Sequence, residues 1–361
     1  MGKARKTMSN RERIEALLRR EKPDRVPIWP FAYAGFAALY SGLTIADAYQ
    51  QPELVLQAER KACDDFDWVF QPSFGYASYG AWEFGGEIKW PAGKYAQAPT
   101  VLKYPVETPE DVFNLRPPDP ATAGMIPLMK RFSKAVAREK YADMPFKGTT
   151  AGACSSFSLA CNICGPERLL RWMIKAPDVA HHLLRIATDH MLFLAEAQKE
   201  ARGTEGVLPR GGEPTSANQL ISPRQFEQFA FPYIKECHDK MLAMGYRHFY
   251  CHICGEHNYN LPLWKQVSFG DPGILSIGHE IALETASRCF PDEIILGNLD
   301  PAIIQTGTPE EIYEATRKNI LEGKGLSNGY IFSPGCDMPP MANREQVMAM
   351  TLAVQDHGWY E

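Results

Sequence analysis

The chain of 361 residues lacks the features that mark membrane, secreted and nucleic-acid-binding proteins. It has no apolar run of about 18 residues or more, so we expect no membrane span. Its basic N-terminal segment has no apolar centre, which argues against a secretory signal. A net charge of −5 argues against a dedicated nucleic-acid binder, which usually carries a basic face. Because the 9 cysteines come without a signal, we expect reduced thiols in a cytoplasmic protein.

Internal repeats, low-complexity linkers and a Gly-rich phosphate-binding loop are also absent from the sequence. What is present is an alternation of short strand-like runs and longer helical stretches. The strands are expected at residues 24–31, 64–74, 145–153, 206–212, 246–255, 273–280, 292–301 and 328–340. About eight strands in this alternation predict a parallel sheet that closes into a (β/α)8 TIM barrel. An open doubly wound sheet is the weaker alternative, because it would carry the missing phosphate loop.

We expect one main domain with a short N-terminal extension. Residues 1–24 are assigned to a leader and an amphipathic helix, for which Ser9 is a plausible N-cap. Residues 25–361 are assigned to a single barrel domain, because this fold commonly exceeds the usual domain size. Two alternating segments, 83–91 and 100–106, predict a small antiparallel excursion between the second and third strands.

The sequence FYCHICGE at residues 249–256 places a histidine and a cysteine at the end of a predicted strand. Because side chains alternate along a strand, His252 and Cys254 point to the same face. Cys336 follows the last predicted strand at an equivalent height, and active residues of α/β barrels project from these strand ends. One imidazole and two thiolates form a soft ligand set that suits Zn²⁺. A vacant fourth position would make the zinc catalytic.

Packing and a zinc ribbon are the alternative interpretations of these cysteines. Buried cysteine is common in protein cores, so each thiol could simply fill space. Cys251/Cys254 and Cys161/Cys164 also have the C-x-x-C spacing of a zinc ribbon. However, the two ends of such a pair point to opposite faces of a straight strand. The pair at 161 and 164 precedes a helix start, where packing is the simpler role.

Several segments resemble the uroporphyrinogen decarboxylase superfamily across nearly the whole chain. The matching segments are RERIEALLRREKPDRVPIW, ETPEDVFNLRPPDP, ISPRQFEQFAFPYIKE, ILGNLDP and SPGCDMPP. Within the superfamily, HICG together with the late GCD resembles the zinc-dependent corrinoid methyltransferase branch. This resemblance implies that His252, Cys254 and Cys336 bind Zn²⁺. Because the chain has no Asp-x-His-x-x-Gly corrinoid motif, it also implies a cobalamin carried by a separate corrinoid protein that docks transiently.

The chain departs from the decarboxylases of the superfamily. Those enzymes resemble one another in an Arg-rich segment after the first strand, which grips the carboxylates of a tetrapyrrole. Here the segment from Trp29 to Gly42 contains no Arg or Lys. Because burying unpaired carboxylates is costly, uroporphyrinogen decarboxylase activity is kept only as the second alternative.

Further polar side chains near the predicted strand ends are candidates for the site. By resemblance, Glu280 is the candidate for a fourth zinc ligand, and its alternative role is to cap the following helix. The candidates for catalysis are Glu213, Asn298 and Asp300. Asp337 could orient a metal ligand, and His257 is expected at the rim. Because Asn and Asp are common turn formers, structural roles stay open for these residues.

Aromatic residues gather near the first two strand ends. We expect a substrate pocket lined by Trp29, Phe31, Tyr33, Phe74 and Tyr76. Aromatic walls suit a flat apolar ring, although aromatic side chains are also common in cores. The predicted function is therefore an O-demethylation, in which a zinc-dependent methyltransferase moves a methyl group from a methoxylated aromatic to the Co(I) of a corrinoid protein.

A methylcobalamin:thiol methyltransferase of the coenzyme M type is the first alternative function, because the same zinc could activate a thiol. A short thiol sulfonate would need a cationic anchor instead of an aromatic wall. The expected partners are thus an aromatic methyl ether and a corrinoid protein, without nucleic acid or membrane. The superfamily resemblance makes a homodimer reasonable.

Overall fold

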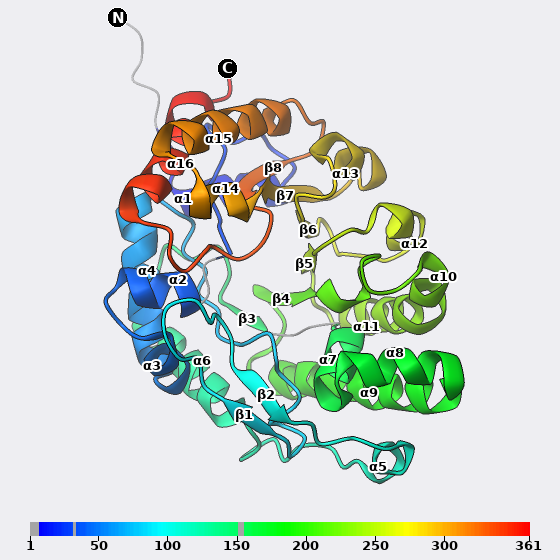
Figure 1. Cartoon of the computed structure of the whole chain (residues 1–361). Helices are drawn as coiled ribbons and strands as arrows, with labels where there is room; N and C mark the ends of the chain where they lie inside the picture. The colour runs from blue at the N-terminus through cyan, green and yellow to red at the C-terminus, as the bar shows by residue number, and fades with distance from the viewer. Residues whose placement is uncertain (1–6, 32–33, 151–154) are drawn as a thin grey trace, which may run out of the picture.

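The computed structural model describes residues 7–31, 34–150 and 155–361 of the chain. A sheet of six parallel strands forms its centre, in the order β3-β4-β5-β6-β7-β8 (Figure 1). The strands span Gly148–Thr150 (β3), Val207–Gly212 (β4), Tyr250–Ile253 (β5), Ile274–Ile277 (β6), Ile294–Leu299 (β7) and Tyr330–Pro334 (β8). Each strand pairs with the next one in the chain, as successive βαβ units require.

The first two predicted strands are extended segments, and the second prediction also overlapped the end of a helix. Ile28 bridges Phe332 of β8 in parallel, and the Val69 N–H donates to the Ile28 carbonyl. The segment around Ile28 thus lies next to β8, and the segment around Val69 lies next to the Ile28 segment. Pro27 and Pro72 interrupt them, because proline has no N–H to donate to a ladder. The predicted α/β fold of barrel type is confirmed, with six regular strands in the parallel sheet of the described residues.

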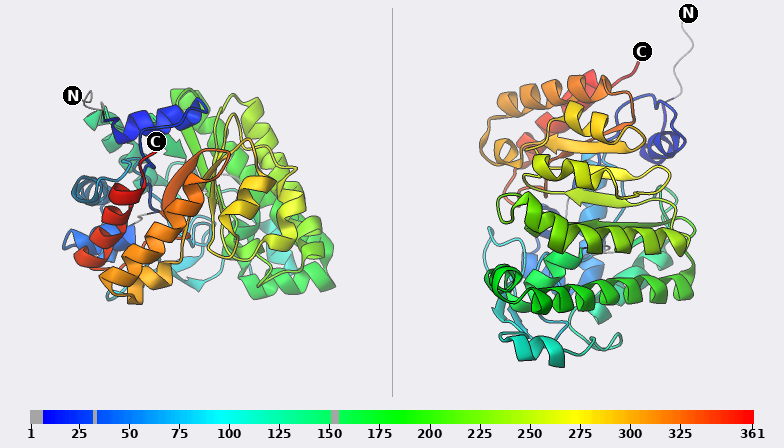
Figure 2. Two further views of the ribbon diagram at one scale, coloured as in Figure 1. Left: turned by 90° about the horizontal axis from the view of Figure 1, so that it is seen from above. Right: turned by 90° about the vertical axis from the view of Figure 1, so that its right-hand side faces the viewer.

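Helices cover the outside of the sheet, and Figure 2 shows the later ones, from green to orange, in rows across it. They span Asn10–Leu18 (α1), Ala34–Tyr40 (α2), Ile45–Gln50 (α3), Pro52–Phe66 (α4), Pro109–Asn114 (α5), Ile126–Glu139 (α6), Ser156–Cys164 (α7), Pro166–Lys175 (α8), Pro177–Arg202 (α9), Pro223–Gln225 (α10), Phe231–Ala243 (α11), Leu261–Trp264 (α12), Leu283–Cys289 (α13), Pro301–Thr306 (α14), Pro309–Lys324 (α15) and Arg344–His357 (α16). Short turns of other helix types span Pro214–Ser216 (η1), Phe226–Ala230 (η2) and Asn258–Asn260 (η3). In the described part of the chain, no helix is both long and apolar enough to span a membrane.

The antiparallel excursion is confirmed as a two-stranded sheet. Its strands, Glu87–Lys89 (β1) and Thr100–Lys103 (β2), pair antiparallel outside the main sheet. Most of their residues are exposed, so the hairpin is an appendage to the barrel.

Helix α1 covers the amino end of the sheet. Ser9 caps it through a reciprocal pair of hydrogen bonds with Glu12, which confirms the predicted N-cap. Ile14 and Leu17 are buried in one apolar cluster with residues from the beginnings of four strands. These strand residues are Leu208, Tyr250, Ile274 and Ile294. The carboxyl end of the sheet is thereby left for a site.

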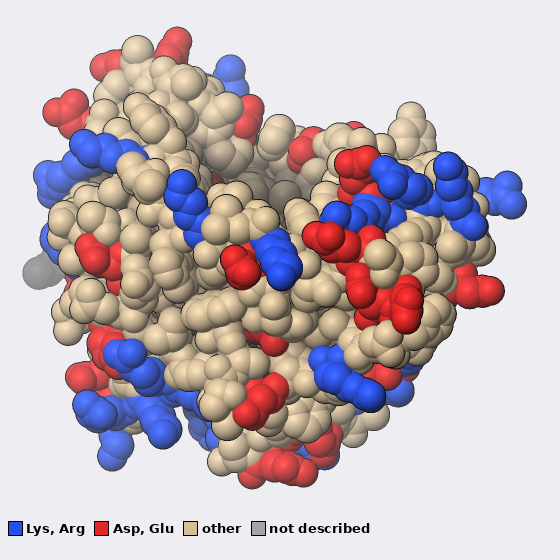
Figure 3. Space-filling view, turned by 60° about the horizontal axis from the view of Figure 1, so that its bottom comes forward, with Lys and Arg blue, Asp and Glu red and all other residues tan. Residues whose placement is uncertain are grey.

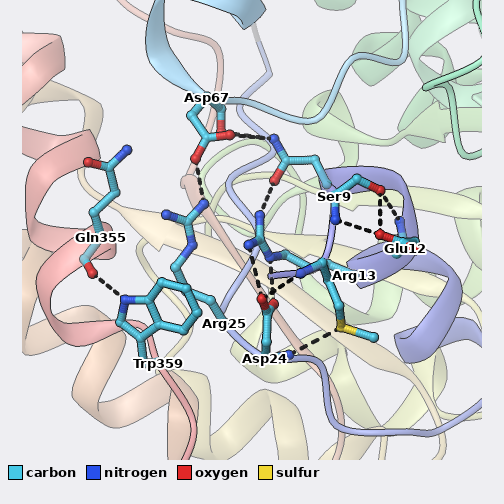
Figure 4. Close-up of polar contacts among 10 residues, drawn as sticks. Ser9, Glu12, Arg13, Asp24, Arg25, Asp67, Gln355 and Trp359 are labelled. Atoms are coloured by element: carbon cyan, nitrogen blue, oxygen red, sulfur yellow. Dashed lines mark hydrogen bonds and ion pairs between the residues drawn. The ribbon is translucent and has the colours of Figure 1, made fainter. Parts of the chain in front are cut away.

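Ion pairs and a hydrogen bond connect α1 and the neighbouring segments of the barrel (Figure 4). Arg13 Nε donates to Asp24 at 2.7 Å, and Arg25 Nη2 donates to Asp67 at 2.6 Å. The Asn10 amide also donates to the Asp67 carboxylate at 2.9 Å. Because the Asn10–Asp67 contact crosses the predicted boundary at residue 24, α1 packs as part of the barrel; the boundary itself stays a prediction.

Candidate metal site at the carboxyl end of the sheet

The ends of β5 and β8 bring the three predicted metal ligands together. His252 lies in β5, Cys254 directly follows that strand, and Cys336 lies two residues beyond β8. The potential ligand atoms of the three side chains all lie within 4.8 Å of one another. The two Sγ atoms are 3.7 Å apart.

Close backbone packing makes this convergence possible. Gly335 precedes Cys336, and a Cβ atom at this glycine would lie 2.8 Å from the His279 nitrogen, closer than real side chains approach. Gly255 follows Cys254 with a φ of 84°, a conformation that favours glycine. The loop after β8 can therefore pass close to the loop after β6, and the chain can turn directly after Cys254.

His252 is held by one ring nitrogen and presents the other. Its Nδ1 atom lies 2.9 Å from the hydroxyl of Ser276, its register partner on β6. Its buried Nε2 atom has no hydrogen-bond partner among the described residues. Leaving a buried polar atom unpaired costs about 1–3 kcal/mol. A cation at Nε2 would remove this cost, and an Nδ1–H bond to the serine would leave the Nε2 lone pair available.

A hydrogen bond between the two thiols shifts their pKa values in opposite directions. Donation from Cys254 lowers the pKa of Cys336 despite burial, and His252 and the Asp337 N–H lower it further. The same hydrogen bond, burial and the charges of Cys336 and Glu280 raise the pKa of Cys254. A divalent cation at this place would deprotonate a coordinating thiol outright.

The geometry of the donors fits Zn²⁺. Tetrahedral Zn–S bonds of about 2.3 Å place two sulfurs about 3.8 Å apart. The Cys254–Cys336 separation of 3.7 Å matches this spacing, and both cysteines are free. A thiol pair with an unpaired imidazole nitrogen therefore offers three ligands and leaves a fourth position open.

Glu280 lies close to this group, but its carboxylate is outside the set of three converging ligands. Its negative charge acts on Cys254, and its Oε2 atom is 3.7 Å from His279 Nδ1. Its side chain is 24% exposed, which leaves it room to turn. Glu280 as the fourth ligand stays a prediction.

The predicted aromatic wall is divided between several places. Phe31 reaches the site, where its ring stacks on His252 at 5.2 Å between centroids. The guanidinium of Arg210 also lies over Phe31, with Cζ 5.0 Å from the ring centroid. Trp29, in contrast, packs in the interior cluster against Tyr250. Phe31 therefore packs against His252 and Arg210, and it lies beside the proposed metal ligands.

Phe74 and Tyr76 belong to a second apolar cluster, which includes parts of α3, α4 and α6. Phe74 stacks on Phe132, and the Tyr76 hydroxyl donates to Glu83 at 2.7 Å. Burial and the Glu83 charge raise the pKa of Tyr76. Tyr33 lies outside the described residues. The four described aromatics are thus not gathered around one pocket.

Glu213 caps the beginning of α7. Its carboxylate oxygens accept from the Phe157 N–H at 3.0 Å and the Ser158 N–H at 3.1 Å. Burial raises the pKa of Glu213 to about 8, although these hydrogen bonds oppose the shift. The contacts give Glu213 a positioning role, and its catalytic role stays a prediction.

Asn298 and Asp300 also make structural contacts. The Asn298 amide donates to the carbonyls of Gly278 and Ile281 at 3.1 and 2.7 Å, joining the loop after β6 to β7. Asp300 is exposed and caps α14 by accepting from the Ala302 N–H at 2.9 Å. Their predicted catalytic roles are untested.

The expectation that His257 lies at the rim is wrong, because its side chain is 0% exposed. Its Nε2 atom lies 3.3 Å from the Glu213 carbonyl, and its Nδ1 accepts from the Trp264 indole at 3.2 Å. The chain turns into η3 and α12 directly after the β5 loop, which folds this histidine inward. Asp337 lies as expected beside a ligand, since its backbone N–H donates to Cys336.

Ser276 and Arg210 were missed by the sequence analysis. Ser276 faces His252 only because β5 and β6 pair in this register, which one sequence cannot specify. Arg210 is 6% exposed and donates to Ser73 at 2.8 Å. A charged residue within the predicted strand 206–212 was the available signal for Arg210.

Acidic and basic side chains intermingle on the face shown in Figure 3. A hollow in the upper part of this view has mostly uncharged walls. This face therefore offers no extended basic surface of the kind that nucleic acid requires.

Fold and site together define an α/β-barrel protein with a candidate catalytic zinc centre. The family described as "Uroporphyrinogen decarboxylase (URO-D)" matches residues 9–357. The chain therefore belongs to the uroporphyrinogen decarboxylase family, as the motif resemblance indicated.

Known proteins similar to this chain include both of the alternative activities considered above, the coenzyme M methyltransferase and the decarboxylase. The "Methylcobamide:CoM methyltransferase MtbA" of Methanosarcina acetivorans is 29% identical over 351 residues, covering 94% of this chain and 96% of the relative. The uroporphyrinogen decarboxylase of Anaeromyxobacter dehalogenans is 24% identical over 358 residues, covering 96% and 99%. A solved "methyltransferase from Methanosarcina mazei" has a TM-score of 0.79 over 97% of this chain and 99% of its own, and at 22% identity it shows the fold.

Proposed function

We propose that this protein is a zinc-dependent enzyme that transfers a methyl group from a methylated corrinoid protein to a thiol of the coenzyme M type. The observation that carries the proposal is the unpaired, buried Nε2 of His252 beside the Cys254–Cys336 pair. The 29% identical relative named as a methylcobamide:CoM methyltransferase supports the choice of methyl donor and acceptor.

The chain's own residues bind and orient the reacting groups. His252, Cys254 and Cys336 would hold Zn²⁺, and Ser276 would fix the imidazole. When bound, Zn²⁺ lowers the pKa of a substrate thiol at the open position. In the transfer, the substrate sulfur would form a bond to the methyl carbon of the partner's methylated corrinoid, and the electron pair of the broken Co–C bond would stay on cobalt, giving Co(I). The thiol proton passes to solvent.

The thiol is a better substrate for this structure than the aromatic ether. Most of the aromatic residues expected to line a flat pocket pack elsewhere. Two apolar clusters contain them, Trp29 in one and Phe74 and Tyr76 in the other. Phe31 keeps O-demethylation as a second candidate, because it alone of the described set contacts a proposed ligand. A soft ligand cluster and the uncharged segment from Trp29 to Gly42 disfavour the decarboxylase activity.

The corrinoid protein would dock at the carboxyl end of the sheet, where the proposed ligands converge. The contact must be transient, because the same corrinoid has to be remethylated elsewhere. A homodimer stays a prediction.

A paired assay tests the proposed direction. The purified protein is incubated with methylcobalamin and 2-mercaptoethanesulfonate, and in parallel with Co(I) cobalamin and an aryl methyl ether such as vanillate. We expect methylation of the thiol only, with about one zinc per chain. Cys336→Ala should lose both zinc and activity, whereas Cys289→Ala, which changes a free cysteine on α13, should keep both. Demethylation of the ether without thiol methylation would overturn the proposal.

A further inference from the structure

A cavity lies on the outer side of the sheet, and none of the three proposed metal ligands lines it. Its volume is about 430 Å³. Helices α6 and α9 form two of its walls and β3 lies at its base; Figure 1 shows these helices below β3, at lower left and lower right. This volume is within the range of about 300–1,000 Å³ that is usual for small-molecule sites.

The deeper walls of the cavity are apolar. Phe74 and Phe132 form a stacked pair with ring centroids 5.3 Å apart, and Met191 and Met241 contribute flexible side chains. All four side chains are at most 5% exposed. Such a lining binds a ring or a short alkyl body and accommodates variation in its shape.

The charged residues that line the cavity are all cationic. They are Lys130 and Lys134 from α6 and Arg202 from the end of α9, and no Asp or Glu lines the space. In a chain with 43 acidic and 38 basic residues, a cavity with three cations and no acid favours an anionic ligand.

Arg202 holds its charge without a carboxylate partner in the described part of the chain. Its Nη2 donates to the Thr149 carbonyl at 2.9 Å, and its Nη1 lies against Gly148, where a Cβ would be 2.8 Å away. Burial of the guanidinium lowers the pKa of Arg202, and only Tyr246 opposes that shift. Arg202 as a whole is exposed, so its guanidinium is held against β3 at the open edge of the cavity.

A neutral hydrogen-bonding group also lines the cavity. Thr150 is 9% exposed, and its Oγ1 is buried without a partner in residues 7–31, 34–150 and 155–361. A buried hydroxyl without a hydrogen-bond partner is unfavourable, and a hydrogen bond to a ligand oxygen would remove that cost.

We propose that this cavity is a binding site for an apolar organic anion, a carboxylate or sulfonate on an aromatic or short alkyl body. The apolar body would lie against Phe74 and Phe132, and the anionic group would reach Arg202. The site is separate from the methyl-transfer centre, so the proposal does not depend on the proposed activity.

Binding of 2-naphthoate to the full-length protein, measured by calorimetry, tests the proposal. We expect a dissociation constant in the micromolar range and at least tenfold weaker binding of the uncharged 2-naphthalenemethanol. Arg202→Gln should weaken naphthoate binding about tenfold, whereas Arg138→Gln, on an exposed part of α6 outside the lining, should not.

Ala201→Trp provides a second variant, because Ala201 is an exposed residue at the cavity edge whose enlargement leaves the core unchanged. It should abolish binding while the melting temperature and zinc content stay as in the parent. Equal affinity for the charged and neutral probes, or binding that survives both Arg202→Gln and Ala201→Trp, would overturn the proposal.

Discussion

At the scale of single residues, the chemistry of the site depends on how His252 uses its two ring nitrogens. Ser276 occupies Nδ1, and this leaves Nε2 for a metal. Cys254 and Cys336 supply sulfur at the spacing of tetrahedral zinc. The ligand types and their alternation along β5 could be predicted from the sequence. The serine could not, because it depends on the pairing of two strands.

Ser276→Ala should weaken zinc binding by about 10–100-fold, because the imidazole loses the hydrogen bond that fixes its orientation. Competition with a chromophoric chelator measures the affinity. Ser276→Thr keeps a hydroxyl and should stay close to the parent. Ser287→Ala, which removes another buried, hydrogen-bonded serine, serves as the control. An unchanged affinity in Ser276→Ala would show that the serine does not position the ligand.

At the scale of elements, the N-terminal helix and its cap were predicted well and the first two strands were not. Local capping and apolar periodicity are contained in the sequence, so α1 begins where Ser9 indicates. The segments around Pro27 and Pro72 are apolar like strands, but ladder hydrogen bonds depend on N–H groups and on a partner. Helix α1 itself is held by contacts outside the helix, among them the burial of Ile14 and Leu17 and the Arg13–Asp24 ion pair.

Asp24→Asn should destabilise the protein by about 3 kcal/mol at neutral pH, because it leaves the buried Arg13 cation without its partner. Partial burial alone would raise the pKa of Asp24, but the ion pair with Arg13 and the Met8 N–H lower it overall. The stabilisation is therefore complete above the unfolded-state pKa of about 4 and is lost as pH falls through the lower folded-state value.

Urea denaturation at neutral and acidic pH checks this prediction. The difference between parent and Asp24→Asn should shrink below about pH 4. Glu21→Gln removes an exposed ion pair and should leave the midpoint unchanged. A difference that stays constant down to pH 3 would show that the carboxylate charge is not responsible.

At the scale of the whole molecule, the proposed metal centre lies at the end of a sheet that is stabilised independently of it. The main apolar clusters extend through the barrel walls and its amino end, where α1 closes the interior. The ligands are carried by strand ends and short loops. A metal bound at this centre would therefore contribute to function more than to folding, unlike the zinc of a small structural finger.

Removal of zinc by a chelator should abolish methyl transfer while the far-ultraviolet circular dichroism spectrum stays unchanged. The melting temperature should fall by only a few degrees, because the metal stabilises only through its binding to the folded state. Adding zinc back should restore both. Loss of the helical signal on chelation would contradict this division between scaffold and site.

The sequence by itself determined the alternation of helices and strands, the capping of helices and the kinds of ligand atoms, since all of these depend on local residue order. It also specified that His252 and Cys254 share a face, because strand side chains alternate. Only the tertiary structure decided that Cys336 meets them, that Ser276 orients the imidazole, and that Trp29, Phe74 and Tyr76 are divided between two apolar clusters. These relations join positions far apart in the chain, and their distances depend on strand register and packing, which local sequence does not encode.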